Sequence, residues 1–196
     1  MTSQSNTEPT RFVEAGGTRF AYRRFGDPIG TPIVLLQHFM GNLDNYDPAI
    51  TDTLAMGREV ILTDNAGVGL STGAAPETVA GMARDAASLI DALGLEQVDL
   101  FGFSMGGHVA QQIAVDRPEL VRRLVLVGTG PRGGDGMDQL APDVVPLDIV
   151  VPTINSYILQ QNLPNAELIL FPDSNHGSHF QFTEVFNRYV TDFVDR

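Results

Sequence analysis

The 196-residue chain contains no cysteine and no lysine, and each absence removes a class of chemistry. Without cysteine there is no disulfide, no thiolate nucleophile and no cysteine-based zinc site. Without lysine there is no Ser-Lys dyad and no Schiff-base intermediate. If the chain is an enzyme, its chemistry has to use other side chains.

Positive charge is also scarce, because only 12 basic residues oppose 24 acidic ones and the net charge is -12. This balance argues against nucleic acid and against an anionic membrane surface as partners. No apolar stretch approaches transmembrane length, and residues 1–10 have neither a basic region nor an apolar run. We therefore expect a disordered leader over residues 1–10 and a cytoplasmic location.

The length and a hydrophobic content of 43% fit one globular domain over residues 11–196. Alternation around Gly16-Gly17 predicts an antiparallel hairpin over residues 11–25. Short apolar runs predict strands that are buried on both faces. They cover residues 33–36, 60–62, 98–101, 124–127 and 168–171. Helical patterns cover residues 77–93 and 182–193. The order predicts an α/β fold with a mostly parallel sheet and helices on both faces.

The most informative motif joins the apolar run at residues 98–101 to a helical pattern that continues to residue 114. Between them, Gly102, Ser104 and Gly106 form Gly-x-Ser-x-Gly. A sharp turn from strand to helix needs glycines where side chains would collide, and it exposes the serine at the helix N-terminus. Backbone N–H groups and the helix dipole favour a developing oxyanion there. We therefore predict Ser104 as a nucleophile.

A serine hydroxyl needs a general base, and the chain has four histidines. His108 follows Ser104 by one helical turn and is expected to pack locally. His38 follows an early strand, where a structural or oxyanion-loop role fits better. His176 lies in the loop after the predicted strand at residues 168–171, and we favour it as the base over His179 in the same loop.

The base in turn needs a carboxylate that fixes its tautomer and stabilises the imidazolium. Asp148 is the preferred candidate and Asp143 is the alternative. The oxyanion donors are expected to be the backbone N–H of Met105 and the N–H of Met40 or Phe39 in the loop after the strand at residues 33–36.

With these motifs the chain resembles the α/β-hydrolase superfamily over nearly its whole length, in its bacterial esterase, lipase and perhydrolase-like branch. The resemblance is carried by residues 35–42, 64–71, 102–107, 148–153 and 176–177. It implies a triad of Ser104, Asp148 and His176 with oxyanion donors Met105 and Met40. A serine nucleophile argues against the dehalogenases and epoxide hydrolases of the superfamily. The usual His-Gly after the third strand is His38-Phe39 here.

The chain departs from the family near residues 130–147, where members usually carry a helical cap. Only about a dozen residues separate a Gly-rich segment from Asp148, so the cap is expected to be absent. Val144-Val145 between two prolines is barely long enough to serve as the strand that delivers the acid.

The expected activity is hydrolysis of carboxylic esters with small or soluble acyl groups, without a metal or cofactor. A cofactor-free perhydrolase or haloperoxidase-like activity is one alternative. A catalytically impaired scaffold with a damaged acid-bearing strand is another. A surface left by the missing cap could also promote self-association.

Overall fold

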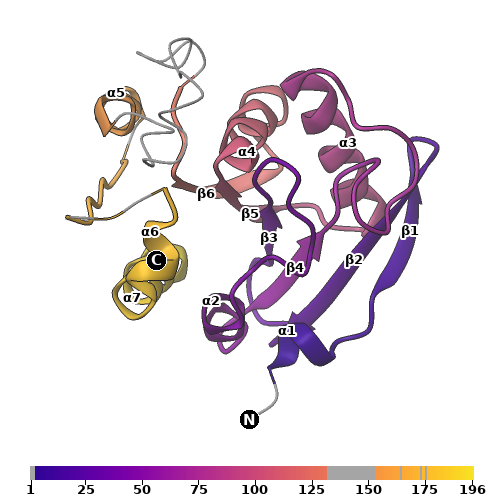
Figure 1. The fold of residues 1–196 in the computed structure, drawn as a ribbon, viewed down its shortest axis with the longest axis horizontal. Coiled ribbons are helices and arrows are strands. Elements are labelled where there is room, and N and C mark those ends of the chain that lie inside the picture. The colour runs from indigo at the N-terminus through magenta and orange to yellow at the C-terminus, as the bar shows by residue number, and fades with distance from the viewer. Residues whose placement is uncertain (1–2, 132–152, 164, 173, 175) are drawn as a thin grey trace.

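Six strands form one sheet in the order β1-β2-β4-β3-β5-β6 (Figure 1). The computed structural model describes residues 3–131, 153–163, 165–172, 174 and 176–196. The strands are β1 (Arg11–Ala15), β2 (Thr18–Gly26), β3 (Ile33–Leu36), β4 (Glu59–Thr63), β5 (Val98–Phe103) and β6 (Val121–Val127). The helices are α1 (Gln4–Thr7), α2 (Pro48–Leu54), α3 (Val79–Ala92), α4 (Met105–Asp116), α5 (Thr153–Asn162), α6 (Ser178–Gln181) and α7 (Thr183–Asp195).

The sheet is mixed, as the sequence predicts. β1 and β2 form the expected antiparallel hairpin, and β2 also pairs antiparallel with β4. From β4 onward, all neighbouring strands are parallel. Because β3, β5 and β6 are adjacent and parallel, the segments that follow them meet at one edge of the sheet, where sites form in α/β folds.

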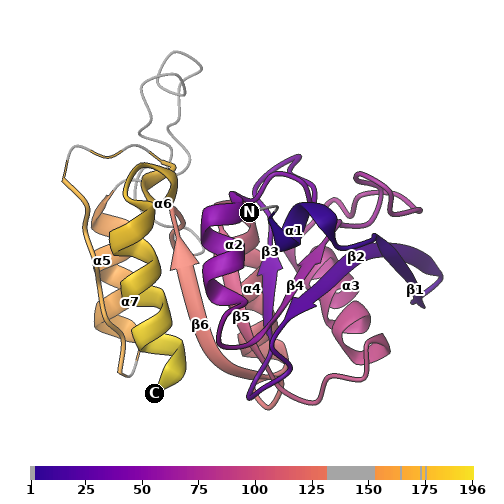
Figure 2. The ribbon, with the colours of Figure 1, turned by 90° about the horizontal axis from the view of Figure 1, so that it is seen from below.

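Helices cover both faces of this sheet (Figures 1 and 2). On one face, α3 and α4 bury Ile90 and Ile113 against strand residues such as Val34 and Leu100. On the other face, α2 and α7 bury apolar side chains around Phe101. Within the described ranges, no helix is long and apolar enough to cross a membrane.

The strand predicted at residues 168–171 is wrong, because this segment has no regular secondary structure. It lies across a cavity from β6, so it makes no ladder with that strand. β6 pairs only with β5 among the described residues. A short apolar run carries no information about whether a partner strand is within reach.

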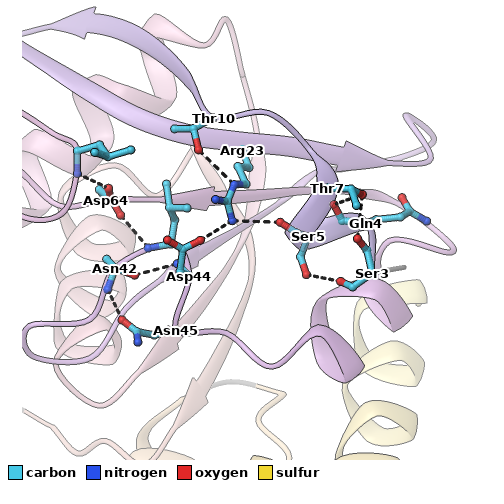
Figure 3. A network of polar contacts seen from close by, with 12 residues as sticks. Ser3, Gln4, Ser5, Thr7, Thr10, Arg23, Asn42, Asp44, Asn45 and Asp64 are labelled. Atoms are coloured by element: carbon cyan, nitrogen blue, oxygen red, sulfur yellow. Dashed lines mark hydrogen bonds and ion pairs between the residues drawn. The ribbon is translucent and has the colours of Figure 1, made fainter. Parts of the chain in front are cut away.

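Part of the expected disordered leader is ordered. Residues 4–7 form α1, where the backbone N–H groups of Gln4 and Ser5 each donate to the Asp52 carboxylate at 3.1 Å. The Arg23 guanidinium donates to the carbonyl of Ser5 and pairs with Asp44 at 2.6 Å (Figure 3). These contacts hold residues 4–7 in place, which composition alone did not predict.

The C-terminal helix is anchored at the opposite edge of the sheet by Asp99, a fully buried residue at the start of β5. Its carboxylate accepts from Arg122 in a bidentate pair and from Arg58 at 3.2 Å. Both arginines also donate to the carbonyl of Val194 near the end of α7. The network holds the C-terminal end of α7 against the sheet. It lies at the starts of β5 and β6, away from the strand ends beside Ser104.

Candidate active site

Ser104 lies at the turn between β5 and α4 in a conformation that side chains rarely adopt, with φ +54° and ψ -118°. Its backbone N–H donates to the carbonyl of Val127 at 2.9 Å, which fixes the turn to the end of β6. Backbone strain of this kind is typical of functional sites, where the surrounding structure holds the strained residue in place.

Glycines make this turn possible. A Cβ at Gly102 would lie 2.6 Å from the carbonyl oxygen of Gly106, and a Cβ at Gly106 would lie 2.1 Å from that of Leu36. The backbone of the turn therefore packs directly on the end of β3. This contact brings the first turn of α4 next to the loop that follows β3.

That first turn begins at Met105. Its N–H belongs to the group of helix N-terminal donors that have no intrahelical acceptor. Met40, the other expected donor, lies in the loop after β3 with φ +60°. A backbone bond from Gly41 N–H to the carbonyl of His38 closes a turn around it. The side chain of Met40 is 77% exposed, so it takes no part in the core.

Asp64, which follows β4, holds this loop in place (Figure 3). Its carboxylate is buried and accepts the N–H of Leu43 at 2.7 Å and the N–H of Leu70 at 2.8 Å. Burial raises the pKa of Asp64, while the bonds from Leu70 and Leu43 oppose that rise. In the sequence, residues 64–71 stand out only as a family signature. The sequence signal that Asp64 holds this loop is the glycine five residues later, because a Cβ at Gly69 would meet the Asp64 carboxylate.

His176 lies on the β6 side of Ser104. Its ring centroid is 5.1 Å from that of Phe103, the residue before the serine. A Cβ at Gly128, just after β6, would lie 2.9 Å from the His176 carbonyl oxygen and 3.1 Å from its ring. The two residues predicted as nucleophile and base thus share Phe103 as a neighbour, at the same edge of the sheet.

His179, the competing base, is fully buried among Phe101, Phe103, Phe180 and Phe186. Neither ring nitrogen has a hydrogen-bond partner among the described residues. Burial, with smaller contributions from His176 and His38, lowers the pKa of His179 to about 4. An imidazole in this setting stays neutral and apolar in character, as a core residue does.

The remaining histidines have local roles. The Nδ1 of His38 lies 2.8 Å from the carbonyl oxygen of Phe39, and its ring meets the edge of Phe103. His108 lies on α4, where burial lowers its pKa. Within the part of the chain that the structure describes, no three His, Asp or Glu side chains gather as metal ligands would.

The predicted acids Asp148 and Asp143 lie outside the described residues. The short Val144-Val145 run and most of residues 130–147, where the cap is expected to be absent, lie outside them too. Of the predicted site residues, Ser104, His176, Met105 and Met40 lie within the described part of the chain. Asp64, Phe103 and Gly128 support them, and sequence reasoning assigned no role to any of these three.

The sequence pattern of the family described as alpha/beta hydrolase fold matches residues 31–148. The chain belongs to this family. A solved α/β-hydrolase fold protein from Chitinophaga pinensis is 31% identical, with a TM-score of 0.90 over 97% of this chain and 98% of that one. An esterase from Exiguobacterium antarcticum shares the fold with a TM-score of 0.78 at 20% identity, over 96% of this chain and 100% of that one.

Curated relatives of this α/β hydrolase include enzymes with different substrates. A putative carbamate hydrolase from Azorhizobium caulinodans is 38% identical over 99 residues, which are 50% of this chain and 37% of the relative. A poly(3-hydroxyalkanoate) depolymerase from Ectopseudomonas oleovorans is 39% identical over 107 residues, which are 54% of this chain and 38% of the relative. The chain thus spans well under half the length of these two relatives.

Proposed function

We propose that this chain is a serine esterase that cleaves carboxylic esters through an acyl-enzyme. The observation that carries the proposal is the strained turn that presents Ser104, with the His176 ring beside Phe103 and Gly128 at the same strand ends. The names of relatives, including a depolymerase of hydroxyalkanoate polyesters, support hydrolysis of acyl compounds in general.

In the proposed first step, Ser104 Oγ attacks the ester carbonyl while His176 takes the hydroxyl proton. The carbonyl oxygen becomes an oxyanion that accepts from the N–H groups of Met105 and Met40. His176 then gives its proton to the leaving alcohol oxygen. In the second step His176 removes a proton from the water that attacks the acyl carbonyl, and it gives this proton to Ser104 Oγ as the acyl–oxygen bond breaks and the acid leaves. Asp148 is proposed as the carboxylate partner of His176.

A fluorophosphonate probe tests this proposal, because it phosphonylates only an activated serine. We expect the wild type and Ser88→Ala, a control serine on α3, to be labelled at the same rate. Ser104→Ala should not be labelled, and His176→Gln should be labelled at least about 1,000-fold more slowly.

Circular dichroism on each variant separates loss of the site from loss of the fold. A folded wild type that does not react would favour the catalytically impaired scaffold. Equal labelling of Ser104→Ala would place the reactive serine elsewhere. Either result would overturn the proposal.

A further inference from the structure

A cavity of about 700 Å³ lies along the edge of β6 that faces away from β5, between that strand, α5, residues 166–172 and α7. Its size falls within the range of about 300–1,000 Å³ that is typical of small-molecule sites. Aliphatic and aromatic side chains form most of its wall, among them Leu126, Leu159, Phe171 and Phe193. It is therefore suited to an apolar ligand.

One end of this cavity is polar and belongs to the candidate active site. His176, Gly128 and Thr129 line it. The Thr129 hydroxyl is buried and has no hydrogen-bond partner among the described residues. That hydroxyl packs against Gly107 on α4, so His176 is the group at this end that an ester would lie beside while its apolar substituent extends into the cavity.

The other end lies away from the site. Gly128 contacts His176, so Leu124, four residues earlier on β6, marks the far end. Figure 2 shows the chain turning back toward α6 at the C-terminal end of α5, beside the start of β6. Leu163 follows α5 directly, Ala166 comes three residues later, and both line the cavity. Four strand residues span about 13 Å. An extended octyl chain of about 9 Å, built from C–C bonds of about 1.5 Å, fits this length.

The strand order decides which side of an ester would enter. β5 lies between β3 and β6, so the oxyanion loop after β3 is on one side of Ser104 and His176 is on the other. In the proposed mechanism the carbonyl oxygen faces the loop after β3. The leaving oxygen has to lie within hydrogen-bond reach of His176 to receive its proton. The group attached to the leaving oxygen therefore starts at the mouth of the cavity.

From this placement we infer that the cavity binds the alkyl chain of the leaving alcohol, so that the enzyme prefers esters of small acids with medium-length alcohols. The inference rests on the proposed function and adds the substrate class. It agrees with the expected preference for small acyl groups and assigns the apolar part of the substrate to the alcohol.

Two isomeric esters test the inference, because octyl acetate and methyl nonanoate contain the same atoms and differ only in which side carries the long chain. We expect kcat/KM for octyl acetate to exceed that for methyl nonanoate by about tenfold or more, because one methylene group in a hydrophobic pocket already changes kcat/KM by about tenfold. Equal rates, or faster cleavage of methyl nonanoate, would overturn the inference.

Ala166→Phe shortens the cavity at its far end. We expect it to lower kcat/KM for octyl acetate about tenfold and to leave ethyl acetate unchanged. Ala92→Phe, which adds the same side chain at an exposed position at the end of α3, is the matched control. Leu163→Phe repeats the test at a partly exposed cavity residue if Ala166→Phe does not fold. Equal loss on both esters would contradict the assignment.

Calorimetric titration of octanol into Ser104→Ala gives a readout that does not depend on catalysis. Octanol should bind, and adding Ala166→Phe to that variant should weaken binding about tenfold. Labelling of Ser104 by the fluorophosphonate together with no octanol binding would overturn the alcohol site and leave the proposed function intact. Octanol binding without labelling would overturn the proposed function, and with it the assignment to a leaving alcohol, and would leave only an apolar binding cavity.

Discussion

Replacing Gly128 by alanine tests whether His176 lies where the proposed chemistry needs it. Gly128 has φ +54°, and its added Cβ would approach the His176 carbonyl oxygen to 2.9 Å and the ring to 3.1 Å. Gly16 is a close control, because it has φ +56° and an added methyl group there would meet nothing within 4 Å. The two variants share the backbone strain and differ in the contact.

The strain of an alanine in left-handed backbone costs about 1–2 kcal/mol. Both variants should therefore lose about that much free energy of unfolding, which corresponds to about 2–8 °C in Tm for a chain of this size. Only Gly128→Ala also displaces the imidazole by a fraction of an ångström or more. Misplacement of a catalytic group by about 1 Å can reduce the rate about 100-fold.

The assay pairs urea unfolding with kcat/KM on p-nitrophenyl acetate, measured where each variant is fully folded. We expect Gly16→Ala to retain wild-type kcat/KM and Gly128→Ala to lose about 10- to 100-fold. If both variants keep full activity, the Gly128 contact is not part of the site. That result would refute the placement of His176 as general base.

Two predictions concern buried charge. The pKa of His179 is about 4 in the native state and near 6.5 when exposed, so between these pH values the unfolded chain binds a proton that the native state does not. The free energy of unfolding therefore falls by up to about 3 kcal/mol as the pH drops from 6.5 to 4. His179→Phe should flatten this pH dependence in urea unfolding, and an unchanged slope would contradict the prediction. Asp99→Asn should cost about 3 kcal/mol because it removes the buried carboxylate that Arg58 and Arg122 share and leaves the buried Arg58 paired only with the exposed Asp195. The exposed-pair control Asp91→Asn should cost less than about 1 kcal/mol, and equal losses would argue against the anchor.

Much of the fold could be predicted because its signals are local. The central strands are short apolar runs, and the turn at Ser104 needs glycines at Gly102 and Gly106 for steric reasons that the backbone contacts bear out. The helix predicted over residues 77–93 is α3, and Thr78 caps it by accepting from the N–H of Gly81.

What could not be predicted depends on contacts between distant segments. Residues 168–171 have the composition of a buried strand, but they pair with none of the strands in the described part of the chain. His176 and His179 stand three residues apart in one predicted loop, and only the structure shows that His179 lies on α6 and is enclosed by phenylalanines. Likewise, sequence alone did not show that Asp64 fixes the loop after β3.

The proposed mechanism depends most directly on a covalent acyl group on one serine. The enzyme is mixed with p-nitrophenyl acetate, quenched in acid within milliseconds, digested and analysed by mass spectrometry. We expect one acetyl group on the peptide that contains Ser104, formed during the initial burst of nitrophenol and absent from Ser104→Ala. Continued turnover with no acetyl on that peptide, or with the acetyl on another residue, would contradict the mechanism.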